Sequence, residues 1–186
     1  MPEADREKWD AKYADPETAP TEPSAVLIEL DPFLPRSGRA IDIAGGGGRH
    51  GIWLAGRGLD VTVADVSPVG LALAQQRAES AGVKINTLVV DLEQNLFPPG
   101  PWDLIVSVCY LWRPLFSIYP EALAPGGILA IVQPTMKNVL RHSRPTTKYL
   151  LEDGELPRLV AGLSILHHRE GWLTDGRHDA CLVARK

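Results

Sequence analysis

The sequence predicts an α/β fold, with a doubly wound, mostly parallel sheet of seven strands, helices on both faces and a C-terminal antiparallel β-hairpin. Strand-like and helix-like segments alternate along most of the chain, as in βαβ units with parallel strands. The run LIVSVCYLW, 104–112, is apolar almost throughout, which is typical of a strand covered on both faces. The last two strand-like segments have too short a connection for a parallel crossover, so they are expected to pair antiparallel.

Boundary residues place the individual elements. Ser67 and Pro68 mark the start of one helix, and the PGG at 125–127 marks the end of another. The predicted helices are 6–13, 24–35, 49–58, 67–82, 113–127 and 152–162. The predicted strands are 39–44, 59–66, 83–92, 101–111, 127–134 and two more after residue 162, joined by a turn at 174–176.

Composition and charge favour one ordinary globular domain. The chain has 186 residues, of which 45% are apolar and 23% charged, and its net charge is −4. It has no block of Lys or Arg, no spanning apolar run and no signal peptide. We therefore expect a cytoplasmic monomer or homodimer without nucleic-acid or membrane partners. Cys109 and Cys181 form no CxxC pair and are expected to be buried free thiols.

Four consecutive glycines follow the first predicted strand in IDIAGGGGRH, 41–50. Glycine lets the backbone pass close to a ligand, and a helix N-terminus offers free N–H donors. Ligands of open α/β sheets bind beyond the carboxyl ends of the strands. Gly46-x-Gly48-x-x-Gly51 also matches the dinucleotide-binding fingerprint, although a plain glycine-rich turn gives the same letters. The loop is predicted to line a ligand.

Acidic residues end three consecutive predicted strands, at Asp42, Asp65 and Asp91. Because parallel strands end at the same edge of a sheet, the three side chains are expected to lie at one edge. Asp65 either accepts hydrogen bonds from ribose hydroxyls or caps the helix that starts at Ser67. Asp91 either accepts from an exocyclic amine or is a solvated strand end. Together they indicate a nucleoside ligand.

At this point the chain resembles the class I S-adenosylmethionine-dependent methyltransferases, which have a Rossmann-like fold. The stretch AIDIAGGGGRHGIWLAGRGLDVTVADVSPVGLALAQQRA is similar to that family's first motif and second strand. VVDLEQNLFPPGPWDLIVSVCYL and EALAPGGILAIVQP are similar to its later motifs. WDAKY, 9–13, resembles the opening of a small-molecule subgroup that includes tellurite-resistance and thiopurine-type methyltransferases.

The resemblance implies S-adenosylmethionine as cofactor, S-adenosylhomocysteine as product, and a role for each matching residue. Asp42 is the acidic residue that opens the motif, in which Ala44 replaces the first glycine. Asp65 would hold the ribose hydroxyls, and Ser107 would lie near the cofactor's amino-acid end or sulfonium. The methionyl part of the cofactor would pass over Ala44, Gly45, Gly46 and Gly48. Val66 would contact the cofactor beside Asp65, and Asp91 and Leu92 would contact the adenine. Within one domain, 1–35 would be a helical cap or lid, 36–134 the cofactor-binding core and 135–186 the substrate-side loop, short helix and hairpin.

The same resemblance implies methyl transfer by in-line displacement, in which alignment and exclusion of water do most of the work. A general base is needed only for an acceptor that is protonated at working pH. The segment SVCY, 107–110, departs from the Asn/Asp-Pro-Pro-Tyr motif of amide and nucleobase methyltransferases. With a core close to minimal size, this favours a small-molecule acceptor. The acceptor atom stays open among S, Se, Te, O and N.

Candidates for the acceptor side lie after the fourth and fifth strands and at the N-terminus. His142 and Tyr110 are the candidate catalytic residues, and His142 can also be a solvated residue of an irregular loop. No metal site is expected, since His167 and His168 point to opposite faces of a strand. The candidate substrate contacts are Trp9, Tyr13, Trp112, Arg113 and Arg141.

Two other functions stay open from the sequence. An NAD(P)-dependent oxidoreductase fits the glycine fingerprint and Asp65, but it needs a second mononucleotide-binding half, where this chain has a hairpin. A non-catalytic S-adenosylmethionine-binding module that acts through partners fits the lack of an evident base. Activity toward any acceptor separates this module from an enzyme.

Overall fold

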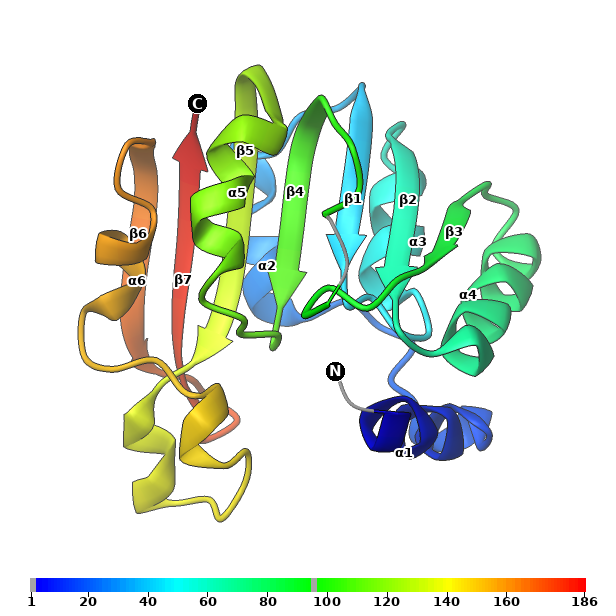
Figure 1. Ribbon diagram of the computed structural model, residues 1–186, viewed down its shortest axis with the longest axis horizontal. Helices are drawn as coiled ribbons and strands as arrows, with labels where there is room; N and C mark the ends of the chain where they lie inside the picture. Colours follow the sequence, from blue (N-terminus) through cyan, green and yellow to red (C-terminus); the bar gives the residue numbers. More distant parts are fainter. Residues whose placement is uncertain (1–2, 95–96) are drawn as a thin grey trace.

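The computed structural model describes residues 3–94 and 97–186. In these residues, seven strands form one sheet in the order β3-β2-β1-β4-β5-β7-β6 (Figure 1). Strands β1 to β5 run parallel, and β7 lies antiparallel between β5 and β6. The predicted doubly wound sheet with its C-terminal hairpin is confirmed.

The bounds of the elements are as follows. The strands are β1 (Arg39–Ile43), β2 (Asp60–Asp65), β3 (Asn86–Val89), β4 (Trp102–Val108), β5 (Leu123–Pro134), β6 (Ser164–Trp172) and β7 (His178–Arg185). The α-helices are α1 (Glu3–Tyr13), α2 (Ala25–Glu29), α3 (Arg49–Ala55), α4 (Pro68–Ser80), α5 (Leu115–Ala122) and α6 (Glu155–Leu159). Short 3-10 helices are η1 (Pro16–Thr18), η2 (Asp31–Phe33), η3 (Met136–Leu140) and η4 (Thr147–Tyr149).

The sheet separates two apolar clusters. Leu104 and Val106 of β4 pack in one cluster with residues of α2, α3 and α4, whereas Ile105 packs in the other with residues of α5 and α6. This alternation follows from the two-residue period of a strand. Figure 1 shows α5 in front of the sheet and α2 and α3 behind it. Both faces are therefore covered, and ligand sites are confined to the edges.

The predicted helix 24–35 is wrong in its second half. α2 ends at Glu29, and the chain continues as η2 through Pro32. Proline has no N–H to extend an α-helix and disfavours helical geometry in the residue before it. The chain therefore tightens into a 3-10 turn at this point.

The predicted helix 113–127 is also too long, because PGG does not end it. α5 ends at Ala122, and β5 begins at Leu123. In the pairing with β4, Trp102 faces Leu123 but Leu104 faces Ile128. The extra residues, PGG among them, form an irregularity inside the strand, where glycine at positive φ is tolerated. The third strand is likewise shorter than 83–92, so that Asp91 lies beyond its end.

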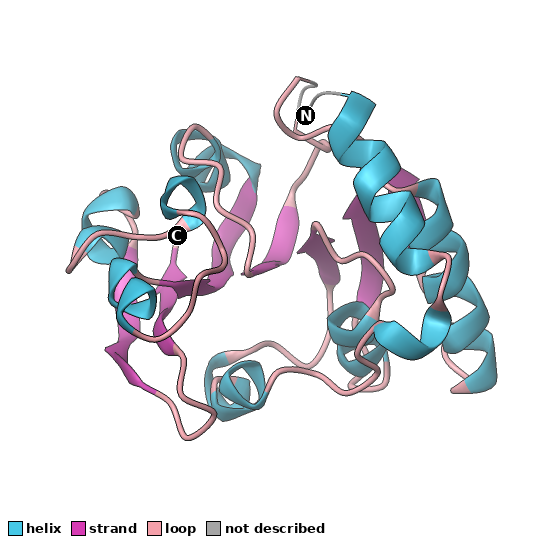
Figure 2. Ribbon diagram, turned by 90° about the horizontal axis from the view of Figure 1, so that it is seen from below, coloured by secondary structure: helices cyan, strands magenta, loops and turns pink. Residues whose placement is uncertain are grey.

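Several loops extend beyond the edge at which the parallel strands end. In Figure 1, α1 lies below the ends of β1 and β2, and the segment 135–150 lies below β5 and β7. Figure 2 views the molecule from this edge. None of the helices in residues 3–94 and 97–186 is long and apolar enough to cross a membrane.

Candidate functional site

The glycine loop between β1 and α3 has a backbone that few side chains tolerate. Ala44, Gly46 and Gly48 have φ values of 53°, 52° and 79°, in the left-handed region. The loop is tied to β2 by the Gly45 N–H, which donates to the Ala64 carbonyl at 3.2 Å. Ala44 carries the strain of a non-glycine residue there, and such strain concentrates at functional sites.

Two buried carboxylates lie beneath this loop. Asp42 is 1% exposed and accepts a hydrogen bond from the Gly51 N–H at 3.0 Å. Asp65 is 6% exposed and accepts from the N–H groups of Gly46 and Ser67, each at 2.8 Å. The side chain that caps α4 is Ser67, whose Oγ accepts from the Gly70 N–H at 2.9 Å. Asp65 therefore holds the glycine loop rather than acting as that cap.

The electrostatics of this pair favour a ligand that donates hydrogen bonds or carries positive charge. Burial raises the pKa of Asp42 to about 7, and the Asp65 carboxylate pushes it further in that direction. Burial also raises the pKa of Asp65, against the effect of its N–H donors. Asp42 Oδ1 is buried and has no hydrogen-bond partner among the described residues. An orphaned buried oxygen of this kind calls for an explanation.

Tyr13 of α1 covers the glycine loop. A Cβ placed on Gly46 would overlap the Tyr13 hydroxyl, and one on Gly70 would lie 2.7 Å from Tyr13 Cδ2. Trp9 stacks on Tyr13 with ring centroids 5.9 Å apart, and Ser67 Oγ donates to Asp10 Oδ1 at 2.5 Å. α1 is thus joined to α4, and Tyr13 occupies space that two glycines leave open.

The other predicted cofactor residues lie at the same edge. Val66 and Leu92 are buried. Asp91 lies in a turn after β3, where its Oδ1 accepts from the Glu93 N–H at 2.9 Å. Ser107 is buried at the end of β4, and its Oγ donates to the Tyr110 carbonyl at 3.2 Å. The structure therefore places these residues, with Asp42 and Asp65, at the edge where the parallel strands β1 to β4 end.

Tyr110 lies on this side of the site too. Its hydroxyl is buried without a hydrogen-bond partner among the described residues. Burial raises its pKa, and the neighbouring Glu93, Tyr119 and Asp91 raise it further. The phenol therefore stays protonated, and as a candidate catalytic group Tyr110 is suited to donate a hydrogen bond rather than to accept a proton.

The predicted substrate contacts after β4 and β5 have protein partners. Arg113 donates to Glu155 with Nε and Nη2 at 2.5 and 2.9 Å, and Nη2 also donates to the Leu150 carbonyl at 3.1 Å. Trp112 packs against the cluster that contains α5. Arg141 lies 3.7 Å above the Trp172 ring, and His142 Nε2 lies 3.0 Å from the Gly176 carbonyl oxygen. Arg113 and Trp112 therefore pack the substrate-side loops in this structure.

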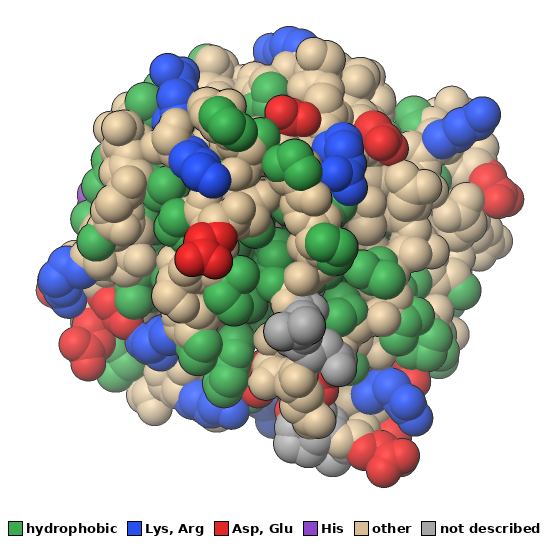
Figure 3. Space-filling view, turned by 45° about the horizontal axis from the view of Figure 1, so that its top comes forward, with side chains coloured by type: hydrophobic (Ala, Val, Ile, Leu, Met, Phe, Trp, Pro, Cys, Tyr) green, Lys and Arg blue, Asp and Glu red, His purple; other side chains and the backbone are tan. Residues whose placement is uncertain are grey.

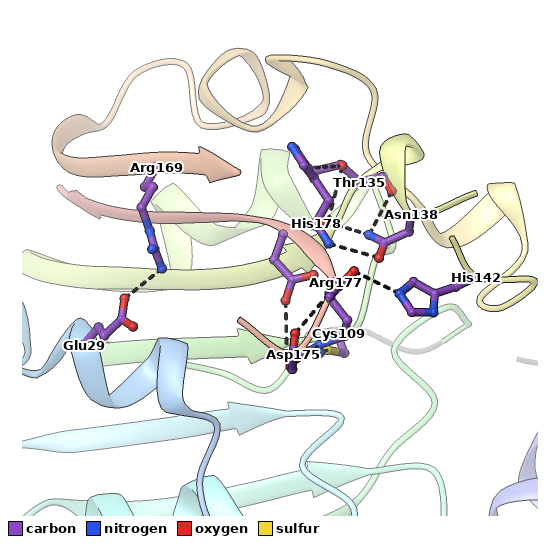
Figure 4. Close-up of polar contacts among 11 residues, drawn as sticks. Glu29, Cys109, Thr135, Asn138, His142, Arg169, Asp175, Arg177 and His178 are labelled. Atoms are coloured by element: carbon purple, nitrogen blue, oxygen red, sulfur yellow. Dashed lines mark hydrogen bonds and ion pairs between the residues drawn. The ribbon is translucent and has the colours of Figure 1, made fainter. Parts of the chain in front are cut away.

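A polar cluster between β4 and the β6–β7 hairpin was missed in the sequence. Arg177 contacts Asp175 at 3.0 Å, Asp179 at 3.5 Å and the Cys109 sulfur at 3.9 Å (Figure 4). Both carboxylate oxygens of Asp179 are buried without a hydrogen bond among the described residues. No local pattern signals this cluster, because Asp175 lies in the turn before β7 and Cys109 is 68 residues away from Arg177.

Cys109 differs from what the sequence indicated, and His50 is a further buried residue of this region. Cys109 is exposed, not buried, because its φ of 58° turns the chain outward just after β4. His50 is buried in the first turn of α3, and burial lowers its pKa to about 3, so it is neutral and does not face solvent. In residues 3–94 and 97–186, no group of three or more His, Cys, Asp or Glu side chains is arranged to hold a metal ion.

A cavity of about 760 Å³ opens beside this cluster. The segment 20–29 forms one wall, and the hairpin forms the other with Arg169, Trp172, Leu173 and Arg177. Arg169 and Glu29 form an ion pair across it at 2.7 Å (Figure 4). Arg49, which directly follows the glycine loop, also lines the cavity. The cavity thus adjoins the loop and has room for a small molecule.

Sequence comparisons find similarity to methyltransferases. Residues 40–127 match the model of a methyltransferase domain. The demethylmenaquinone methyltransferase of Thermus thermophilus is 34% identical over 104 residues, which are 51% of this chain and 46% of that protein. The tRNA 5-carboxymethoxyuridine methyltransferase of Escherichia coli is 30% identical over 128 residues, 63% of this chain and 47% of that protein. The chain spans about half the length of these curated relatives.

Solved structures have the same fold. TehB from Haemophilus influenzae superposes with a TM-score of 0.72 at 22% identity, over 87% of this chain and 61% of that one. The geranyl diphosphate C-methyltransferase of Streptomyces coelicolor, solved with S-adenosylhomocysteine, gives a TM-score of 0.68 at 14% identity, over 87% and 79%. At these identities the likeness establishes the fold.

Proposed function

Because the chain belongs to the class I S-adenosylmethionine-dependent methyltransferase superfamily, we propose that it transfers the cofactor's methyl group to a small-molecule acceptor. Among the relatives, the demethylmenaquinone and geranyl diphosphate enzymes are, by their names, methyltransferases of small molecules. The tRNA enzyme has a macromolecular acceptor. The cavity of about 760 Å³ next to the glycine loop supports the small acceptor.

The observation that carries the cofactor assignment is the carboxylate pair beneath the glycine loop. Asp42 Oδ1 lacks a donor, and a bound amino-acid end with its ammonium group supplies one. Asp65 uses one lone pair on each oxygen for the Gly46 and Ser67 N–H groups. A carboxylate accepts about four hydrogen bonds, so Asp65 retains capacity for the ribose hydroxyls. The residues present therefore fit the cofactor.

The cofactor supplies, when bound, a methyl group already activated by a sulfonium. The protein's part is alignment and exclusion of water. Tyr13 closes the space above Gly46. Of the predicted cap, α1 is the part that opens for binding, because Val26 and Leu27 of α2 are packed in the core. Tyr110 stays protonated and donates a hydrogen bond. For an acceptor that must lose a proton, His142 is the candidate base: if Nε2 donates to the Gly176 carbonyl, Nδ1 is left to accept.

Isothermal calorimetry without an acceptor tests the cofactor. We expect binding of S-adenosylmethionine and S-adenosylhomocysteine and no heat from NAD⁺ or NADP⁺. Asp65→Ala should weaken binding by roughly 1–3 kcal/mol, the value of hydrogen bonds to a charged group. Asp60→Ala, an exposed aspartate on the same strand, is the matched control. Binding of NAD⁺, or equal affinity in Asp65→Ala, would contradict the assignment.

A screen of thiols, small phenols and oxyanions of selenium and tellurium then tests for turnover. Methylated product from any of them supports the enzyme. Tight cofactor binding with no product from any acceptor would favour the alternative, a non-catalytic cofactor-binding module that acts through partners.

A further inference from the structure

The segment between β5 and α6 has a charge unlike the rest of the chain. Residues 135–151, here called the arm, contain Lys137, Arg141, Arg144 and Lys148 and no Asp or Glu, in a chain of net charge −4. On the face shown in Figure 3, by contrast, basic and acidic side chains are interspersed. The arm is therefore a local basic surface on an acidic protein.

The arm is held firmly at its base. The Met136 N–H donates to the Leu151 carbonyl at 2.8 Å, and the Leu151 N–H donates to the Pro134 carbonyl at 3.0 Å. Gln133 Nε2 donates to the Tyr149 carbonyl at 2.7 Å. The arm consequently stands as a fixed protrusion beyond the ends of β5 and β7 (Figure 1), at the edge that also holds the glycine loop.

The tip of the arm exposes aliphatic side chains among its charges. Leu140 is 75% exposed, the highest value for a large apolar residue in the described part of the chain, and Val139 beside it is 48% exposed. Arg141, Arg144 and Lys148 form no ion pair within residues 3–94 and 97–186, whereas Lys137 pairs with Asp153 at 3.0 Å. The arm thus combines two exposed aliphatic side chains with three cations that have no ion pair in the described residues.

We propose that the arm docks on a membrane surface of anionic phospholipid. Leu140 and Val139 enter the boundary between headgroups and acyl chains, and Arg141, Arg144 and Lys148 contact lipid phosphates. Aliphatic tips favour lipid over single-stranded nucleic acid, which binds exposed aromatic rings. The nearby aromatics, Tyr149 and Trp172, lie under Lys148 and Arg141.

Peripheral docking of this kind needs no spanning segment, so it revises the sequence-based expectation of a protein without a membrane partner. One small arm gives weak attachment. Each surface cation contributes modestly, and salt screens it. Binding is therefore reversible and depends on the fraction of anionic lipid. It requires neither cofactor nor catalysis, so its test is independent of the proposed function.

Co-sedimentation of the full chain with vesicles tests the proposal. We expect binding at low salt to vesicles of phosphatidylglycerol and phosphatidylcholine in equal parts, and none to pure phosphatidylcholine. The double variant Arg144→Glu/Lys148→Glu should lose at least about tenfold in partitioning, since attraction becomes repulsion at two positions. Leu140→Ser should lose several-fold in partitioning. Added salt should then remove a larger fraction of its binding than of the parent chain's binding.

Two control variants match these changes away from the arm. Lys84→Glu reverses an exposed charge before β3, and Ile165→Ser removes an exposed apolar side chain at the far end of β6. Both should partition as the parent chain does, and circular dichroism checks that all variants fold. The proposal is overturned if the parent chain ignores anionic vesicles, if the controls lose as much as the arm variants, or if the arm variants lose binding to tRNA but not to vesicles.

Discussion

The cofactor side and the acceptor side of the site are built in different ways. On the cofactor side, the ends of β1 and β2 hold a glycine loop through backbone N–H groups and two buried aspartates, with partners 9 and 19 residues apart. On the acceptor side, Thr135 contacts His178 across 43 residues and Arg177 contacts Cys109 across 68. On the cofactor side, carboxylates close in sequence hold the backbone. On the acceptor side, side chains are held by other side chains far away in the sequence.

This difference predicts which substitutions should most impair cofactor binding. Backbone crowding should damage the cofactor side, because its ligand contacts are made by a loop with no room for side chains. On the acceptor side, several side chains contribute to the site together. Removing one of them should therefore reduce activity less than crowding the glycine loop. Three substitutions, taken in order of expected effect, test this contrast.

Gly46→Val should nearly abolish cofactor binding, with a loss of at least about a hundredfold while the fold persists. A branched side chain at φ 52° is strained and would overlap the Tyr13 hydroxyl above the loop. Gly82→Val is the matched control, because Gly82 has φ 70° but a Cβ added to it would meet no atom within 4 Å. If calorimetry finds normal affinity for Gly46→Val, the ligand does not pass over the loop.

Asp42→Asn should change the pH dependence of stability. Burial raises the pKa of Asp42 to about 7, so between about pH 4 and pH 7 the folded chain holds a proton that the unfolded chain releases. Stability therefore falls as pH rises through this window, by up to about 4 kcal/mol. Asparagine removes that contribution, and the slope left over is that of Asp65 and other groups.

Urea unfolding at pH 5 and pH 8 measures the effect. The parent chain should lose more stability between the two values than Asp42→Asn, whereas the exposed Asp60→Asn should follow the parent. Parallel behaviour of Asp42→Asn and the parent would mean that Asp42 is ionised in the folded chain throughout.

His142→Ala should have the smallest effect, a several-fold loss of turnover with cofactor affinity unchanged. His142 is exposed, and the contact of its Nε2 with the Gly176 carbonyl oxygen orients the ring. Steady-state kinetics with a responsive acceptor, together with calorimetry, separates the two quantities. Turnover equal to that of the parent would show that His142 has no catalytic role. A loss of cofactor affinity would contradict the separation of the cofactor side from the acceptor side.

This contrast also explains how far the sequence could go. The mostly parallel sheet, its C-terminal hairpin and the shared edge of Asp42 and Asp65 followed from alternation and from the rule that parallel strands end together. The order of the strands did not follow from it. The ends of α2 and α5 could not be predicted in this way. They depend on the 3-10 turn at Pro32 and on the irregularity in β5, which are features of local backbone geometry.

The acceptor side escaped prediction because its contacts are long-range. In the sequence, Arg113 has no evident partner, because Glu155 lies 42 residues later. The structure pairs the two side chains. Cys109 reads as a buried thiol within an apolar run until its left-handed backbone is seen. The contact of Arg177 with Cys109 has no local signal either, because 68 residues separate the two.

The position of β7 has a consequence for the order in which the protein is made. β7 leaves the ribosome after the other six described strands, yet it lies between β5 and β6, and its residues 178–184 are buried. β1 to β4 can pair while translation continues, but β5 keeps an unpaired edge until β7 arrives. Nascent chains should therefore need chaperone protection at the acceptor side, and a stalled or truncated product would aggregate through that edge.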